Sequence, residues 1–151
     1  YRFITSMFIH FGVEHLGSNM ISLFALGPYV EHYYGHFLYL VLYVFSGIFG
    51  NLLTILYEGI SAEFVVSAGA SGAIFGLLSV FILFAMNPRL RKLFPIKRVL
   101  ISVTLSLIAG RMDPSINFMA HVGGLGGGLI LAFIMQAILR YSAKNRGKTS
   151  A

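Results

Sequence analysis

The sequence lacks cysteine and has little charge. Without cysteine, the chain can form no disulfide, no thiolate nucleophile and no cysteine-ligated metal site. Only 11% of its 151 residues are charged, whereas soluble domains average about a quarter. By contrast, 57% are hydrophobic and the mean hydropathy is +0.82. This balance is typical of a membrane protein, and the net charge of +6 is better explained by membrane topology than by nucleic-acid binding.

Five apolar segments could cross a bilayer as helices. A spanning helix needs about 17–25 apolar residues, and only the fourth segment looks short or tilted. The chain shows no series of ten-residue alternating strands, which a membrane β-barrel would need. The sequence therefore predicts an all-α polytopic membrane protein, because helices satisfy their own backbone polar groups in lipid. The predicted spans are 13–30, 37–57, 69–87, 97–110 and 117–139.

Lysine and arginine are distributed unevenly between the predicted loops. Five lie in the loop 87–98 and four in the segment 140–151. In a chain with five spans, this loop and this segment lie on the same side of the membrane. Only Arg2 and Arg111 fall on the other side. Since cytoplasmic loops carry the excess of basic residues, we expect these nine in the cytoplasm. We divide the chain into a membrane core, 1–139, and a basic cytoplasmic tail that lacks fixed structure at its end.

Four polar side chains share one depth in the predicted membrane. His15 and Asn19 lie near the start of the first span, Ser71 near that of the third and His121 near that of the fifth. All three spans enter from the outside, so the four residues lie within ~10 Å of the outer surface at 1.5 Å rise per residue. His15 and Asn19 are four residues apart and project from one helix face. Polar groups at membrane depth are costly, which indicates a functional site.

Other interpretations of these residues stay open. His10, His15 and His121 could be three metal ligands, although no HExxH pair accompanies them. Either of the last two histidines, taken alone, could equally be structural. A transporter could also carry such groups, but typically at the midplane and with internal repeats, which this sequence does not show.

Two pairs of glycines have the spacing of close helix contacts. Gly72 and Gly76 are four residues apart in the third span, as are Gly124 and Gly128 in the fifth. Small residues at this spacing let two membrane helices approach closely. We expect these spans to pack together, which would bring the serine of one within reach of the histidine of the other.

Three motifs of the chain resemble those of the rhomboid intramembrane serine proteases. "GASGAIFG" around Ser71 is similar to the family's GxSGxxxG, and "AHVGGLGGG" around His121 is similar to its AHxxGxxxG. "HFGVEHLGSN" is similar to HxxxxHxxxN, with His10, His15 and Asn19 in register. A weaker likeness is "YR" at the start of the chain, where the family usually has Trp-Arg.

The resemblance covers residues 1–128 and implies a fold. A rhomboid-like helical bundle has a core of six spans, of which five are visible here. We expect the first span to precede Tyr1, so that the chain is a fragment or a trimmed form of a longer protein.

The resemblance also implies a Ser–His dyad. Ser71 would be the nucleophile and His121 the general base that accepts its proton. The side chains of His15 and Asn19, together with the Ser71 backbone N–H, would stabilise the oxyanion of the tetrahedral intermediate.

Three further residues have supporting roles by resemblance. Phe75 would stack on the base, although it could equally be a core phenylalanine. Gly69 would turn its carbonyl away from the nucleophile or expose its N–H. His10 lies at the start of the first helix. No metal and no cofactor are expected.

The expected activity is that of a serine endopeptidase cleaving the transmembrane helices of other membrane proteins near the outer face. Its partners would be these substrates and the lipid bilayer, with no nucleic acid; the oligomeric state is not predicted. The alternative is an inactive rhomboid-like protein that binds membrane clients, although such relatives typically lack the serine or the histidine. The short loops and absent cysteines favour a bacterial inner membrane, and the short fourth span is the expected gate for substrate.

Overall fold

The computed structural model describes residues 1–62, 64, 66–113 and 116–149, with side chains up to Asn145. This part of the chain is helical, which confirms the predicted fold class. Positions 63, 65 and 114–115 in two predicted loops, and 150–151 in the predicted tail, lie outside the described residues. The elements are α1 (Arg2–Thr5), the 3₁₀ turn η1 (Ser6–Phe8), α2 (Val13–Tyr34), α3 (His36–Ser61), α4 (Ser71–Met86), α5 (Ile96–Met112) and α6 (Phe118–Thr149).

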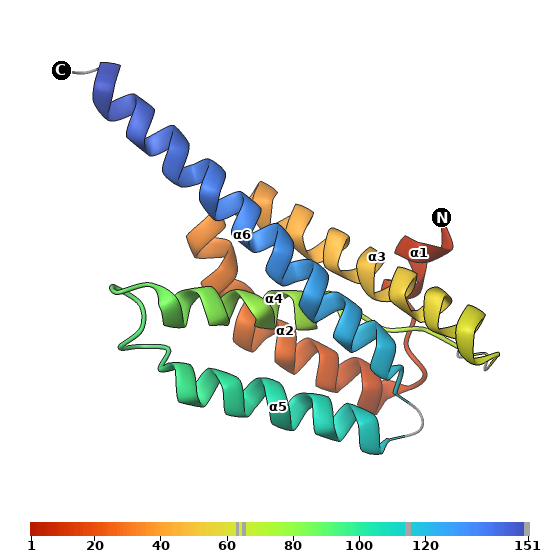
Figure 1. Ribbon diagram of the computed structural model, residues 1–151. Helices are drawn as coiled ribbons and strands as arrows, with labels where there is room; N and C mark the ends of the chain where they lie inside the picture. Colours follow the sequence, from red (N-terminus) through yellow and green to blue (C-terminus); the bar gives the residue numbers. More distant parts are fainter. Residues whose placement is uncertain (63, 65, 114–115, 150–151) are drawn as a thin grey trace.

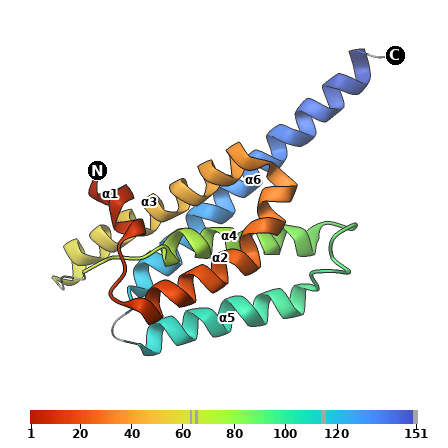
Figure 2. The same ribbon diagram turned by 180° about the vertical axis from the view of Figure 1, so that it is seen from behind.

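Helix α4 is the centre of the bundle. The other four long helices all contact it, and Figures 1 and 2 show them around it from two sides. Twelve of its 16 residues are buried. A helix that is apolar all round is one enclosed by others, and α4 therefore holds its first residue, Ser71, in a fixed place at one end of the bundle.

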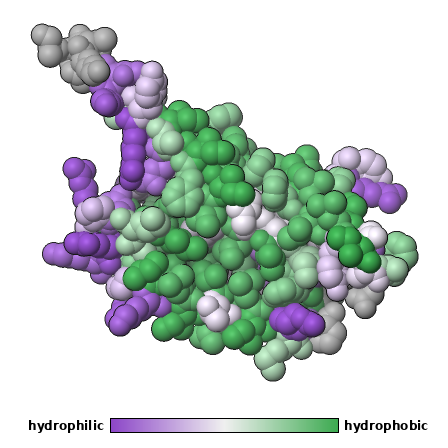
Figure 3. Space-filling view, viewed as in Figure 1, coloured by the Kyte–Doolittle hydropathy of each residue, from purple (hydrophilic) through white to green (hydrophobic). Residues whose placement is uncertain are grey.

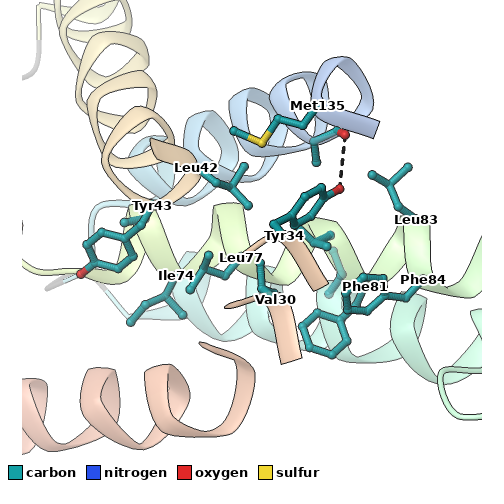
Figure 4. Packing of buried hydrophobic residues seen from close by; sticks show 14 of the residues in the cluster. Val30, Tyr34, Leu42, Tyr43, Ile74, Leu77, Phe81, Leu83, Phe84 and Met135 are labelled. Atoms are coloured by element: carbon teal, nitrogen blue, oxygen red, sulfur yellow. Dashed lines mark hydrogen bonds between the residues drawn. The ribbon is translucent and has the colours of Figure 1, made fainter. Parts of the chain in front are cut away.

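The core packs α4 against α2, α3 and α6. Leu42, Leu77 and Phe84 are each no more than 2% exposed, and Figure 4 shows their helices converging on them. Within this apolar cluster the hydroxyl of Tyr34 donates a hydrogen bond to the carbonyl oxygen of Ala132 at 3.3 Å. That bond satisfies a buried hydroxyl that would otherwise destabilise the core.

The surface fits a lipid environment. α3 and residues Phe118–Asn145 of α6 are long and apolar enough to cross a membrane, and α4 is a shorter apolar helix. Large apolar side chains such as Phe24 and Phe37 are about three-quarters exposed, at 77% and 76%. Figure 3 shows this apolar surface between hydrophilic ends. The number of spans stays a prediction.

The predicted loop 31–36 is wrong in extent. α2 continues to Tyr34 and α3 begins at His36, so the connection is Gly35 alone. Gly35 has a φ of +79°, a conformation open to glycine that commonly ends helices. A proline within α2, Pro28, accompanies the bend of its last turns seen in Figures 1 and 2.

The division into a membrane core and a cytoplasmic tail stays a prediction, but α6 does not end near residue 139, where the last predicted span ends. It continues to Thr149 and extends beyond the other helices (Figure 1). Arginine, lysine and alanine are good helix formers, and the charges of Arg140 and Lys144 end the apolar segment without ending the helix.

Candidate active site

One cavity of about 150 Å³ brings the four predicted polar side chains together. It lies at the end of the bundle where α2, α4 and α6 begin, called the site end below. Ser71, His121, His15 and Asn19 all line it. Three helices that are distant in sequence thus each contribute at least one polar side chain to the same cavity.

Ser71 is the first residue of α4 and is partly exposed. Ala70 precedes it as the N-cap and makes no side-chain capping bond. The first N–H groups of a helix have no acceptor within the helix, and the helix dipole favours negative charge at this end. The backbone here is therefore suited to stabilising an oxyanion beside the Ser71 hydroxyl.

His121 is held in the first turns of α6 and is only 5% exposed. The ring of Phe75, one turn after Ser71, stacks on the imidazole with the centroids 4.2 Å apart and the planes at 17°. Both ring nitrogens of His121 are buried without a hydrogen-bond partner among the described residues. A buried imidazole left unpaired in this way is available to a group that enters the cavity.

His15 and Asn19 present N–H donors to the same cavity. The backbone N–H of Phe11 donates a long hydrogen bond of 3.5 Å to His15 Nδ1, which in a neutral ring leaves the proton on Nε2. The Asn19 side chain is 5% exposed, and its Nδ2 donates to the His15 carbonyl at 2.8 Å. An amide nitrogen carries two N–H groups, so one remains for a ligand.

Gly69 occupies a position that only glycine fits. Its φ is +113°, and a Cβ there would lie 2.6 Å from Cε1 of His15. Its N–H donates to the carbonyl oxygen of Ser6 at 2.9 Å. Of the two alternatives for Gly69, an exposed N–H does not fit this bond, and the turning away of its carbonyl stays a prediction. The residue lets the loop before Ser71 pass close to the His15 ring.

His10 contacts the site indirectly. Its ring meets that of His15 edge-on, with the centroids 5.2 Å apart, and it does not line the cavity. Within the described part of the chain, no three histidine, aspartate or glutamate residues lie close enough to hold a metal ion. His10 thus supports the His15 ring from outside the cavity.

The four paired glycines lie where α4 meets α6. A Cβ on Gly124 would collide with the carbonyl oxygen of Gly72, and a Cβ on Gly128 would lie 2.8 Å from the carbonyl oxygen of Gly76. No side chain fits between the two backbones at either level, which is the close approach that small residues permit. The contact fixes the first two turns of α4 against the part of α6 that follows His121.

Asn51 of α3 is a site-end residue that the sequence did not single out. Its Nδ2 donates to the Phe3 carbonyl and to Ser6 Oγ, both at 2.9 Å, and its Oδ1 accepts from Ser67 Oγ at 3.1 Å. It therefore ties α1 and η1 to the loop that leads into Ser71. The feature of the sequence that could have pointed to Asn51 is a lone asparagine within an apolar span.

Asn117 is a second residue found only in the structure. Its Oδ1 accepts from the backbone N–H of Ala120 at 3.0 Å, which caps α6, and its Nδ2 donates to Thr54 Oγ1 of α3 at 3.0 Å. It also lines the cavity. An asparagine directly before a helix is a common capping signal, and here the cap anchors the turn that carries His121.

Comparisons with known proteins agree on the class of this helical bundle. The family model described as Rhomboid domain matches residues 1–138. The chain belongs to the rhomboid family, and it is a membrane protein.

Similar proteins occur in a bacterium, a plant and a fungus. The chain is 32% identical over 133 residues to Rhomboid protease GluP of Bacillus subtilis, covering 87% of this chain and 25% of that protein. It is 34% identical over 138 residues to RHOMBOID-like protein 7 of Arabidopsis thaliana, covering 89% and 42%, and 32% identical over 134 residues to Rhomboid-type serine protease 2 of Emericella nidulans, covering 87% and 26%. The chain thus spans a quarter to two-fifths of these proteins' lengths, and their spread of sources does not single out a bacterial membrane.

Proposed function

We propose that this chain is the core of an intramembrane serine endopeptidase that cleaves transmembrane helices of other proteins near the outer face of the membrane. The supporting observation is the single cavity lined by Ser71, His121, His15 and Asn19. Membership of the rhomboid family and the protease names of its relatives support the reaction class.

The first half of the reaction forms an acyl-enzyme. Ser71 Oγ attacks the carbonyl carbon of the scissile peptide as His121 accepts its proton. The oxyanion is stabilised by the Ser71 backbone N–H, His15 Nε2–H and the remaining Asn19 N–H. His121 then gives the proton to the leaving nitrogen as the C–N bond breaks, which releases the new amino terminus and leaves the acyl group esterified to Ser71.

The second half consumes one water. His121 accepts a proton from the water as its oxygen attacks the ester carbon. The second tetrahedral intermediate collapses, the Ser71 oxygen leaves and takes back the proton, and the new carboxyl terminus departs. Because the cavity contains several polar side chains, lies at one end of the bundle and is lined by the partly exposed Ser71, we propose that water reaches the dyad from the outer side.

Ser71→Ala tests this proposal. We expect the variant to keep the fold, because Ser71 is only partly buried and alanine favours helix formation. We expect it to cleave no transmembrane substrate peptide in liposomes. Asn87→Ala, at the opposite end of α4, is the matched control and should cleave as wild type does. Cleavage by Ser71→Ala at the wild-type rate would refute the assignment, and a wild-type protein that binds substrate without cleaving it would favour a client-binding role. Loss of cleavage on adding a chelator would favour metal chemistry instead.

A further inference from the structure

Helix α5 carries an unexplained glycine near its site end. Glycine disfavours helix formation relative to alanine, yet Gly110 lies inside α5 and is one of its three buried residues, with Val99 and Val103. Its φ is not positive, so backbone conformation does not require glycine. A close approach to another group is the remaining reason for its small size.

The group that approaches Gly110 is the imidazole of His121. A Cβ on Gly110 would lie 2.8 Å from Nδ1 and 3.2 Å from Cε1 of that ring. The first distance is closer than real Cβ atoms come to such neighbours, and the second is tighter than most real contacts. The ring cannot readily swing away, because Phe75 stacks on its face at 4.2 Å and the residue is 5% exposed. The imidazole is thus held between an aromatic face and the bare backbone of α5.

The contact between Gly110 and His121 matters for the orientation of the imidazole, because no hydrogen bond from the described part of the chain fixes that ring. In a serine–histidine–aspartate triad, a carboxylate that accepts the Nδ1 proton fixes the imidazole. Here Nδ1 has no hydrogen-bond partner among the described residues. The orientation of the ring therefore rests on its contacts, and the contact at the Nδ1–Cε1 edge is with Gly110.

We propose that Gly110 is a positioning residue for the dyad: with no side chain there, α5 closes on the Nδ1–Cε1 edge of His121 and, together with Phe75, orients the ring so that Nε2 serves Ser71. The proposal rests on the proposed function of Ser71 and His121. It also makes the reactivity of the dyad depend on the placement of α5, which buries little else against the bundle.

The first test measures dyad reactivity without a transmembrane substrate. Gly110→Ala should slow labelling of Ser71 by a fluorophosphonate probe at least tenfold, and should lower kcat for a substrate peptide while KM changes less than twofold. Gly59→Ala is the matched control, because a Cβ at that helical glycine meets nothing within 4 Å. It should label at the wild-type rate. Equal labelling of the two variants would overturn the proposal, whereas a wild-type protein that does not label would overturn the proposed function instead.

The second test measures Tm, so it still tests the proposal if Gly110→Ala folds too poorly for the labelling experiment. The added methyl group clashes with the His121 ring, so Gly110→Ala should lower Tm in the wild-type chain and not in a His121→Ala background, where the ring is absent. An equal fall of Tm in both backgrounds would overturn the proposal, because the clash would then lie elsewhere. Phe75→Leu adds a third comparison: it should combine non-additively with Gly110→Ala in the labelling rate, since both act through one ring.

Discussion

Substituting Gly124 by alanine tests whether the α4–α6 contact brings Ser71, the proposed nucleophile, to His121, the proposed base. The added Cβ would collide with the carbonyl oxygen of Gly72 and would lie 2.7 Å from its carbonyl carbon, whereas ordinary contact begins near 3.4 Å. Both partners are backbone atoms, so no side chain can move aside. The start of α4 and the part of α6 around Gly124 must therefore separate by more than about 1 Å.

This displacement acts directly on the proposed dyad, because Ser71 directly precedes Gly72 and His121 lies one turn before Gly124. A misplacement of about 1 Å can lower the rate of an enzyme about 10²-fold, so we expect Gly124→Ala to cleave 10- to 100-fold more slowly. Overpacking of this kind typically destabilises a protein by about 1–3 kcal/mol, and Tm should fall accordingly.

The assay is cleavage of a transmembrane substrate peptide in liposomes, with Tm measured on the same preparations. Gly126→Ala is the control, because it lies in the same helix and a Cβ there meets nothing within 4 Å. It should match wild type in both measurements. If Gly124→Ala also retained the rate and Tm of the wild-type protein, close α4–α6 contact would not be what brings Ser71 to His121.

Two further predictions concern the polar groups around the cavity. Asn19→Ala should lower kcat about 10²–10³-fold, as loss of one oxyanion donor does, and an unchanged kcat in the cleavage assay would remove Asn19 from the site. Asn51→Ala leaves Ser67 Oγ and the Phe3 carbonyl without their partner, so the free energy of unfolding should fall by about 1–3 kcal/mol; denaturation at wild-type stability would show that the junction around Asn51 does not hold the loop before Ser71.

Hydropathy alone predicted the five long helices but not where they end. The segment 117–139 marks the apolar part of α6, whereas the helix continues to Thr149, because arginine and lysine end an apolar stretch and still favour helix. The predicted extent of the loop 31–36 was wrong for a related reason. Its polar residues are helical, and Gly35 alone makes the turn.

Depth in the membrane predicted which polar residues would meet. The four predicted residues, His15, Asn19, Ser71 and His121, are dispersed over 107 positions of the sequence. In the structure they all line one cavity at one end of the bundle. Their catalytic roles stay predictions that the experiments above address.

The contacts of Gly110 and Asn51 could not be predicted in the same way. Each depends on which face of one helix meets another, and neither the rotation of α5 nor that of α3 can be read from spacing. A glycine inside a short apolar span and an asparagine inside a long one were visible as oddities. Only the three-dimensional arrangement shows that one adjoins His121 and the other the loop before Ser71.

The most direct test of the account is to locate a fluorophosphonate adduct on the purified protein by mass spectrometry. The account predicts one adduct, on Ser71, and its loss in His121→Ala, because the serine is reactive only when the imidazole accepts its proton. An adduct on another residue, or undiminished labelling of Ser71 without the imidazole, would contradict it.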